Sequence, residues 1–349
     1  MKKLTALVLL LVLIAGAIAG ATAYVLYRRA RDPYRGYPGV EQFVDIPPGV
    51  GTSMIGRRLI AAGVVSDELA FRVALWLSGR ARRLQAGEYR FDHPLSAFDV
   101  IEKIARGEVD FLPLTVPEGL TIADVSRVFE ASGLGSATSF VEAAKDASLI
   151  RDLDPLASDL EGYLFPDTYA MSRRAGAPRV VRAMVERFHQ VLSEELRAAA
   201  RERGLSIRQL VTLASIVEKE TARPDERPLV AAVYVNRLAI GMGLQCDPTV
   251  IYALQRAGRF DGNLRHSDLM FESPYNTYRH AGLPPGPIAA PGRRSLEAAA
   301  HPATTDALYF VSRNDGSHEF AKTLDEHNRN VLKYQIQYFR DRRLAGRGH

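Results

Sequence analysis

The pattern of apolar and polar residues divides the chain into one long uncharged run and a body of shorter elements. The run, 4–27, carries no charged side chain over 24 residues. As a helix it would measure about 36 Å, more than the roughly 30 Å of a bilayer's hydrocarbon core. It predicts a transmembrane helix. Its orientation stays open at this point, because Lys2 and Lys3 before the run nearly balance the arginines that follow it. A cleaved signal peptide is the alternative, because Ala21-Thr22-Ala23 offers small residues to a peptidase, but the run is longer than such a peptide needs.

Short elements separated by glycine and proline follow this run. Residues 28–42 contain two Pro and two Gly and predict a linker that lifts the body off the membrane. Residues 43–110 then alternate strands with helices and predict a compact module. Its expected strands cover 43–46 and 88–91, and its expected helices 52–62, 67–77 and 97–105.

The start of this module recurs further along the chain. Val116-Pro117-Glu118-Gly119 aligns with Ile46-Pro47-Pro48-Gly49, and without a gap Gly133 falls on Gly63. The match predicts two strand-turn-helix units of one design, the second opening another domain at 111–343 before a tail at 344–349. Chance similarity of two common turns is the alternative.

Helical periodicity dominates the second domain. A hairpin is expected near 308–320, with its turn at Asn314-Asp315-Gly316. Helices are expected at 178–203, 207–221, 250–257 and 324–343, with a further one that ends at Leu238. The fold class is therefore α+β, with an N-terminal transmembrane helix, a small α/β module and a larger, mostly helical domain with short strands.

One carboxylate interrupts an apolar helix face. Positions 207, 211, 214 and 218 share a face, and the first three are Ile, Val and Ala, so Glu218 is expected to point inward. Glu220, roughly 200° further round the helix, is expected to point toward solvent. Burial against apolar neighbours would raise the pKa of Glu218 and suit it to donate a proton. The alternative is a structural Glu held by an arginine or a helix cap.

Composition narrows the class of function. A net charge of +5 and a pI near 9.3 suit work beside an anionic membrane or polymer. No basic block with interleaved aromatics is present, so no nucleic acid partner is expected. The single Cys246 excludes an intrachain disulfide and a cysteine metal cluster, and is read as a buried small side chain more readily than as a catalytic thiol.

The absence of other catalytic motifs leaves catalysis by a carboxylic acid as the remaining enzymatic option. Neither a zinc-protease His-Glu motif nor a G-x-S-x-G nucleophile turn is present, so no metal and no cofactor are expected. Glycoside cleavage is the typical reaction of a carboxyl with a raised pKa, and hydrolysis usually needs two carboxyls. Glu161, on an aromatic loop at 160–169, and Asp247 are available as the second, but the sequence gives no distance.

Six motifs, in one order, resemble the YceG-like, or MltG, family of endolytic murein transglycosylases. They are Leu-Ala-Ser-Ile-Val-Glu-Lys-Glu-Thr at 213–221, Val-Asn-Arg-Leu at 235–238, Leu-Gln-Cys-Asp-Pro-Thr-Val-Ile-Tyr at 244–252, Tyr-Asn-Thr-Tyr at 275–278, Gly-Leu-Pro-Pro-Gly-Pro-Ile at 282–288 and Ala-His-Pro-Ala at 300–303. The likeness extends from the apolar run to about residue 340. The module at 43–110 also resembles LysM-like modules that bind cell-wall glycan, with a structural spacer as the alternative.

The resemblance implies a lyase, a single-pass inner-membrane protein anchored through 4–27, with 1–3 as a cytoplasmic N-terminus and its body in the periplasm. Glu218, the first Glu of its motif, would protonate the oxygen between N-acetylmuramic acid and N-acetylglucosamine in nascent peptidoglycan. As a carboxylate it would then take the C6 hydroxyl proton while that oxygen attacks C1, which leaves a 1,6-anhydromuramyl end and terminates glycan elongation.

Further residues and partners follow as hypotheses from the same resemblance. Peptidoglycan glycan strands are the expected partner, with cell-wall synthases as candidate protein partners. Cys246 departs from the small polar residue expected in its motif. A non-catalytic, membrane-anchored scaffold that binds peptidoglycan for the synthases is the alternative function. The hypothesised substrate-binding residues are Glu161, Gln245, Asp247, Tyr275 and Asn276.

Overall fold

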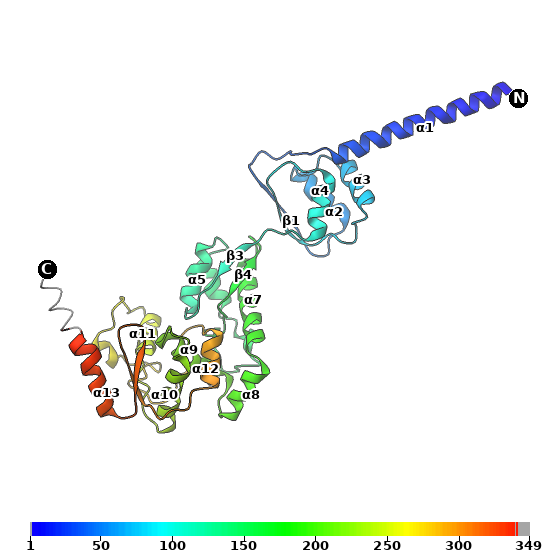
Figure 1. Ribbon diagram of the computed structural model, residues 1–349. Helices are drawn as coiled ribbons and strands as arrows, with labels where there is room; N and C mark the ends of the chain where they lie inside the picture. Colours follow the sequence, from blue (N-terminus) through cyan, green and yellow to red (C-terminus); the bar gives the residue numbers. More distant parts are fainter. Residues whose placement is uncertain (1, 339, 341–349) are drawn as a thin grey trace. The chain divides into compact units, whose positions relative to one another are not determined.

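The computed structural model describes residues 2–338 and 340, and the chain divides into two compact units, Met1–Leu112 and Pro113–His349 (Figure 1). Helices predominate throughout the described part. The strands described there pair into three two-stranded sheets, β1 with β2, β3 with β4 and β5 with β6. The α+β class expected from the sequence is confirmed.

The first unit combines a long apolar helix with a small module. Residues 9–31 of α1 are long and apolar enough to cross a membrane. Antiparallel β1 and β2 pair from Gln42 opposite Phe91 to Ile46 opposite Gly87. The elements of this unit are α1 (Lys2–Arg31), β1 (Gln42–Ile46), α2 (Thr52–Ala61), α3 (Glu68–Ser78), β2 (Gly87–Phe91) and α4 (Ala97–Arg106).

Local signals place the ends of these helices. Ser96 and Asp99 form a capping box at the start of α4, and left-handed Gly107 ends it, as the sequence predicts. Helix α3 starts at Glu68 because Asp67, rather than Ser66, supplies its cap: the Asp67 carboxylate accepts from the Ala70 N–H at 3.0 Å.

The segment expected to be a free linker is packed against the module. Residues 28–31 belong to α1, and Ala30 and Tyr37 lie in the hydrophobic core of the first unit. Tyr34 exchanges two backbone hydrogen bonds with Leu95, and the Gly36 N–H donates to the Gly63 carbonyl at 2.8 Å. The tyrosines that accompany the Pro and Gly residues give this segment apolar surface to bury, so α1 is fixed to the module rather than tethered to it.

The predicted repeat is confirmed. Each unit contains a strand, a turn and a helix in this order, β1 and α2 in the first and β3 (Leu112–Thr115) and α5 (Ile122–Ala131) in the second. The matched glycines Gly49 and Gly119 have φ of 78° and 75°, and Gly63 and Gly133 have φ of 69° and 77°. L-residues with a side chain avoid this left-handed region, which explains why the same positions carry glycine in both copies.

The second unit is mostly helical. Its elements beyond β3 and α5 are α6 (Ala137–Ala143), the short 3-10 helix η1 (Ala147–Ile150), β4 (Thr168–Met171), α7 (Gly176–Val191), α8 (Glu194–Glu202), α9 (Ile207–Glu220), α10 (Arg227–Ala239), α11 (Asp247–Arg256), the 3-10 helix η2 (His266–Met270), α12 (Arg293–Ala300), β5 (Tyr309–Ser312), β6 (His318–Ala321), α13 (Leu324–Val331) and the π-helical turn η3 (Leu332–Gln337).

Two expected helices differ in extent. The helix expected at 178–203 is broken after Val191, because the Ser193 hydroxyl accepts from the Leu196 N–H and so caps a new helix, α8. The closing helix continues from α13 into the π-helical turn, and its expected last residues, 341–343, lie outside the described part of the chain. The hairpin is confirmed as β5 and β6, with Asn314 at φ 65° in its turn.

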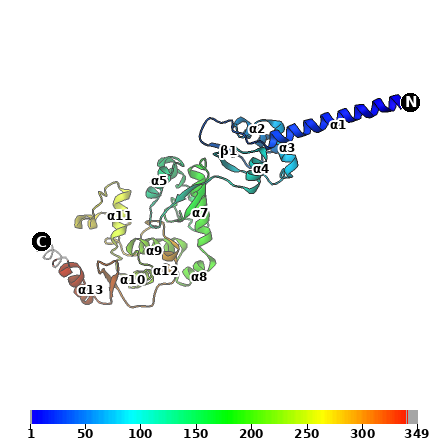
Figure 2. The ribbon, with the colours of Figure 1, turned by 45° about the horizontal axis from the view of Figure 1, so that its top comes forward.

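Helix α9 is the buried centre of this unit. Every residue from Leu210 to Val217 is buried. Helices α10 and α12 lie beside α9 in both ribbon views (Figures 1 and 2), and α8 and α11 also contact it. Hydrophobic burial of its middle therefore holds α9 in place, and side chains reach a surface at its two ends.

Alanine substitutions at the matched glycines Gly63 and Gly133 test whether the segment 28–42 packs against the module. Gly133→Ala should lower the free energy of unfolding of the second unit by about 1–2 kcal/mol, the cost of a left-handed L-residue. Gly63→Ala should cost the first unit more, because its Cβ would also lie 2.7 Å from the Gly36 carbonyl carbon, whereas a Cβ at Gly133 meets open space.

Urea unfolding of the detergent-solubilised chain can follow the two units separately. Hydrogen exchange of peptides from α2, measured by mass spectrometry, reports the first unit, and a cysteine-directed probe on Cys246 reports exposure of the second. Equal losses in the two variants would contradict the close contact between Gly36 and Gly63.

Candidate functional site

The C-terminal end of α9 presents two carboxyl groups. The helix starts with a capping box formed by Ser206 and Gln209, runs through the core, and ends at Glu218, Lys219 and Glu220. Because the two Glu residues are two positions apart on a helix, they leave it in different directions. In the structure the side chains of Glu218 and Glu220 therefore contact different residues.

Glu218 points inward, as its position on the helix predicts. Its side chain is 5% exposed, and Arg227, the first residue of α10, donates from Nη2 to Oε1 at 2.8 Å. The Gly292 N–H donates to Oε2 at 2.9 Å. The Arg227 side chain is itself only 7% exposed. Both carboxylate oxygens are therefore engaged, in the arrangement of a buried charged pair.

A third charged side chain, Glu118, joins this pair. Arg227 Nη2 lies 3.4 Å from Glu118 Oε2, so one guanidinium holds two carboxylates. Glu118 comes from the turn of the second repeat unit, where the neighbouring Gly119 carbonyl accepts from Lys219 Nζ at 3.1 Å. A Cβ at Gly292 would overlap the Glu118 carboxylate, so a larger residue there would displace that side chain from Arg227. We refer to Glu118, Glu218, Arg227 and Gly292 as the Arg227 cluster.

The sequence reasoning did not single out Glu118 or Arg227 as site residues. The signal available for Glu118 was its place in the repeated turn, where the first unit has Pro48 and the second a charged residue. Arg227 carried no comparable signal, because the chain is rich in arginine. Only the fold brings the turn, α9 and α10 together.

Glu220 does not point toward solvent, contrary to the expectation from helical periodicity. Its Oε1 accepts from the Tyr234 hydroxyl at 2.8 Å and from the Cys246 thiol at 3.0 Å. Burial raises the pKa of Glu220, and the nearby charge of Asp247 raises it further, while the hydrogen bonds from Cys246 and Tyr234 oppose the shift. The reason for the difference is that α10 and the loop before α11 cover the second face of α9.

Glu220 lines a pocket of about 420 Å³, which we call the Glu220 pocket. Two hypothesised substrate-binding residues, Gln245 and Asp247, line it as well. The Tyr278 hydroxyl donates to Asp247 Oδ1 at 2.6 Å. Gln245 has φ of 50°, a strained left-handed conformation for a residue other than glycine. The carboxyls of Glu220 and Asp247, the amide of Gln245 and the ring of Tyr278 thus line one pocket.

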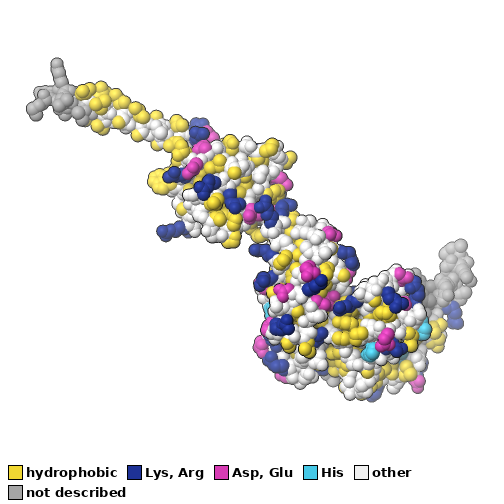
Figure 3. All heavy atoms as spheres, turned by 180° about the vertical axis from the view of Figure 1, so that it is seen from behind, with side chains coloured by type: hydrophobic (Ala, Val, Ile, Leu, Met, Phe, Trp, Pro, Cys, Tyr) yellow, Lys and Arg dark blue, Asp and Glu magenta, His cyan; other side chains and the backbone are white. Residues whose placement is uncertain are grey.

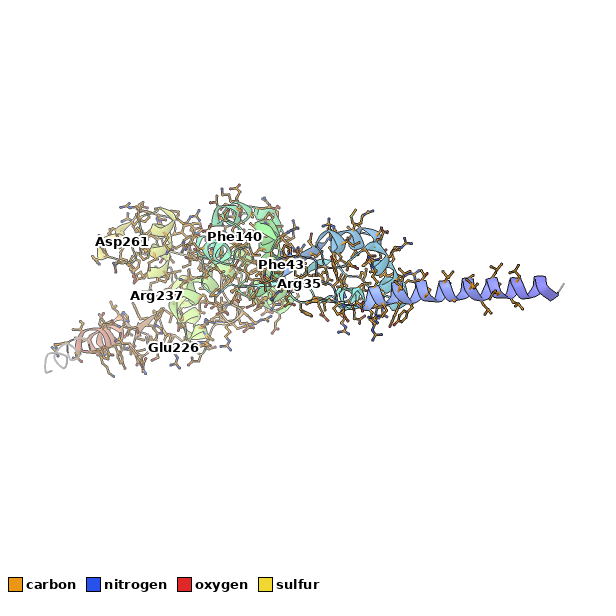
Figure 4. All side chains as sticks on the ribbon, turned by 90° about the horizontal axis from the view of Figure 1, so that it is seen from above. Arg35, Phe43, Phe140, Glu226, Arg237 and Asp261 are labelled. Carbon is orange, nitrogen blue, oxygen red and sulfur yellow. The ribbon has the colours of Figure 1, made fainter. Side chains whose placement is uncertain are left out.

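Other elements complete the walls of this pocket. Arg237 lies toward the C-terminal end of α10, away from Glu226 at its start (Figure 4), and it lines the pocket with Tyr309 of β5. His327 of α13 stacks on Tyr309 and also lines the pocket. Its Nδ1 is buried without a hydrogen-bond partner among the described residues. A polar ligand in the pocket could satisfy such an atom.

Glu161 lies in a second pocket, of about 350 Å³, lined also by Arg127, Tyr252, Arg256 and Phe260. Its carboxyl bridges two helices, accepting from the Ile122 N–H of α5 at 3.1 Å and from the Tyr252 hydroxyl of α11 at 3.2 Å. Burial raises the pKa of Glu161 to about 8. This carboxyl is therefore largely protonated at neutral pH.

The structure separates the remaining two hypothesised residues from the Glu220 pocket. The Tyr275 ring packs against Tyr252 at 5.0 Å between centroids, beside the Glu161 pocket. Asn276 is fully buried, and its Nδ2 donates to the carbonyls of Leu269 and Phe271 at 2.9 and 2.7 Å. Because its amide is used within the protein, Asn276 shapes the loop rather than facing a ligand.

The Gly/Pro-rich segment at 282–288 runs along α9. Arg208 Nε donates to the Pro285 carbonyl at 2.6 Å, and the Ile288 N–H donates to the Ser215 hydroxyl at 3.1 Å. Ala290 then exchanges hydrogen bonds with Gly119 and Leu120. The segment thereby delivers Gly292 to Glu218.

The described residues contain no group of three or more His, Cys, Asp and Glu side chains placed to hold a metal ion. Cys246 is buried, and burial raises the pKa of its thiol well above the usual value. The thiol is therefore protonated and is a poor nucleophile.

Glu161 makes stability depend on pH. The unfolded chain releases this proton near pH 4.5, and the folded chain retains it to about pH 8. Folding is therefore favoured at low pH by this group, and that contribution is lost as pH rises from about 4.5 to about 8. Glu161→Gln, which cannot ionise, should gain stability relative to the unmodified chain over this interval. Thermal unfolding at several pH values measures it, with exposed Glu142→Gln as control, and parallel curves for all three proteins would contradict the protonated carboxyl.

Comparisons with known proteins identify the family. A sequence profile of the YceG-like family matches residues 44–333. A protein of Bacillus subtilis strain 168 named endolytic murein transglycosylase is 33% identical over 307 residues, which covers 83% of this chain and 84% of that protein. One of the same name from Streptococcus pneumoniae serotype 2 strain D39 is 30% identical over 321 residues, which covers 83% of this chain and 58% of that longer protein.

A solved structure agrees with these relatives. The crystal structure of a putative YceG-like protein from Listeria monocytogenes is 30% identical in sequence and superposes with a TM-score of 0.57. The match covers 83% of this chain and 98% of that one. Since the family profile and the Bacillus relative each span most of the sequence, this chain belongs to the YceG-like family.

Proposed function

We propose that this protein is an endolytic peptidoglycan lytic transglycosylase, a lyase that cleaves the bond between N-acetylmuramic acid and N-acetylglucosamine inside glycan strands. The observation that carries the proposal is a carboxyl, Glu220, whose pKa is raised by burial and which lies at the wall of a polar, aromatic-lined pocket. The names of the Bacillus and Streptococcus relatives support the same reaction.

The geometry favours Glu220 as the group that transfers the proton. A general acid needs a proton and access to the leaving oxygen. Burial raises the pKa of Glu220, which lines the pocket. The hydrogen bonds that Tyr234 and Cys246 donate to its carboxyl both go to Oε1, and Oε2 accepts neither of them. Glu218 instead has both oxygens bound, to Arg227 and Gly292. The assignment of the proton donor to Glu218 stays a prediction from the sequence, in competition with this one.

The reaction needs no water. The protonated carboxyl donates its proton to the glycosidic oxygen while the bond from that oxygen to C1 of the muramic acid residue breaks. The C6 hydroxyl oxygen of the same sugar forms a new bond to C1, and its proton passes to the carboxylate. One carboxyl therefore serves as acid and then as base and ends as it began, and the product is a 1,6-anhydromuramyl end.

Asp247 is suited to assist this step. An oxocarbenium-like transition state carries positive charge near C1, which a neighbouring carboxylate stabilises. Asp247 lines the same pocket as Glu220, and the Tyr278 hydroxyl fixes its orientation. Gln245, in its strained backbone conformation, is proposed to bind a sugar hydroxyl or N-acetyl group. Glu161, with Tyr275 beside it, is proposed to line a more distant subsite.

The membrane anchor bears on the cellular location of the reaction. We infer that α1, whose residues 9–31 are long and apolar enough to span a bilayer, holds the body in the periplasm, where nascent strands leave the membrane-bound synthases. Cutting such strands would end their elongation. The synthases are then candidate partners.

Glu220→Gln should lower the yield of 1,6-anhydromuramyl ends at least about 100-fold, because general acid–base catalysis contributes roughly 10²–10⁴-fold. Glu218→Gln should retain the reaction wherever the variant folds, although it leaves the buried Arg227 with one partner fewer. Mass spectrometry of muropeptides released from purified sacculi measures the products. Thermal unfolding checks both variants, and Glu142→Gln is the surface control.

The outcomes separate the competing assignments. Loss of anhydro ends in a folded Glu218→Gln variant, with activity kept in Glu220→Gln, would return the catalytic role to Glu218. Reducing muramic acid ends would indicate hydrolysis instead. If the unmodified protein makes no new ends, the scaffold function is favoured.

The topology gives an independent prediction. Because α1 would cross the membrane once, an alkaline phosphatase fused after His349 should be active in intact cells, and a cytoplasmic reporter at the same place should be silent. The opposite pattern would overturn the periplasmic location of the body.

A further inference from the structure

Helix α3 carries an apolar face that the module leaves uncovered. Leu69, Arg72 and Trp76 follow one another at intervals of three and four residues and so share a face. Trp76 is 81% exposed and Leu69 is 52% exposed, and Leu77 beside them is also exposed. A single exposed apolar side chain needs no explanation, whereas a Trp and two Leu together on one helix indicate an interaction surface.

This face belongs to the helix that is packed on the anchor. α3 lies against the last turns of α1, and Arg29 Nε of α1 binds Asp67 Oδ2, the cap of α3, at 2.7 Å. On α4, the Phe98 ring contacts that of Tyr27, the last residue of the uncharged run. Since the run ends at Tyr27, the bilayer surface would lie at the level where α1 meets the module. Figure 3 shows hydrophobic side chains protruding from the module on the side from which α1 leaves it.

Charges around this face match an anionic surface. The chain continues from α3 through Gly79 to Arg80, Arg82 and Arg83, and the last two are exposed. Arg80 is paired with Glu102, and Arg72 is only loosely paired with Glu68, at 4.0 Å. Basic residues close to the bilayer are attracted by anionic headgroups, by about 1 kcal/mol each. Trp is favoured at the same level, because its ring is apolar and its N–H is polar.

We propose that the face formed by Leu69, Arg72, Trp76 and Leu77, the α3 face, lies in the interfacial layer of an anionic phospholipid membrane, so that the module rests on the bilayer beside its own anchor. The inference rests on the proposed anchoring by α1 and goes beyond it. Anchoring alone requires only a spanning helix, whereas the α3 face fixes the orientation of the module. The absence of a free linker, with Tyr34 and Gly36 bonded to the module, keeps the α3 face at the membrane surface.

A glycan is the competing occupant. Trp76 also borders a groove of about 510 Å³ with Phe71, Arg57 and Arg72, and sugars do stack on aromatic rings. The membrane is favoured because Leu69 and Leu77 project beyond the groove lining and offer a sugar no polar contact. The position next to the spanning run points the same way.

The single Trp makes the test direct. The full chain is reconstituted into vesicles of phosphatidylglycerol and phosphatidylethanolamine, and flotation shows that it inserts. Lipids brominated at different acyl carbons then quench the Trp76 emission. Strong quenching that is greatest for bromine nearest the headgroups, with a blue-shifted emission and poor quenching by aqueous iodide, is the expected result. Leu69→Glu/Leu77→Glu should remove most of the lipid quenching, whereas Leu156→Glu, at an exposed site in the second unit, should leave it unchanged.

Failure of the inference is distinguishable from failure of the anchor. If the protein does not float with the vesicles, the anchor itself is wrong, and the α3 face has no membrane to rest on. If it floats but iodide quenches Trp76 fully and brominated lipids do not, the docking is overturned while the anchor stands. A shift of Trp76 emission in detergent on adding soluble glycan fragments, with no lipid quenching, would assign the α3 face to glycan.

Discussion

The buried guanidinium of Arg227 is the contact on which the end of α9 depends. It joins α10 to the last turn of α9 through Glu218 and to the repeated turn through Glu118. A buried ion pair adds little net stability, but removing Glu218 or Arg227 leaves the other buried charge with one partner fewer. The Arg227 cluster therefore holds the α9–α10 pair against two segments far away in the sequence, the repeated turn at Glu118 and the chain at Gly292. Both contacts are made through Nη2 of Arg227.

The contact between Glu118 and Arg227 distinguishes the two copies of the repeat. In both copies a strand, a left-handed glycine and a helix form the same frame. Only the second copy carries a charged side chain in the turn, and that side chain reaches the Arg227 cluster. The strand-turn-helix repeat thus contributes to packing in the first unit and supports the Arg227 cluster in the second. Sequence alone could reveal the copy, but not which of its positions had acquired a new partner.

Periodicity predicted the existence of most helices and failed at the end of α9. The 3.6-residue rule assumes that one side of a helix is covered, which holds for Ile207, Val211 and Ala214. At the last turn, Tyr234 and Cys246 close over the opposite side, so Glu220 is buried by elements that the rule cannot see. The same reason explains Asn276, whose motif suggested a ligand contact but whose amide supports its own loop. Local pattern specifies elements, whereas the surroundings of a side chain depend on residues distant in sequence.

The thiol of Cys246 shows how a residue that departs from its motif can be accommodated. It donates to Glu220 Oε1 from a fully enclosed position, and burial keeps it in the protonated form. Oxidants and disulfide-forming enzymes attack thiolates that they can reach, and this sulfur is neither ionised nor accessible. A chain with one cysteine can therefore pass through an oxidising compartment without forming dimers through mixed disulfides. The sulfur occupies the place of the small polar residue that the motif predicts and brings no redox chemistry with it.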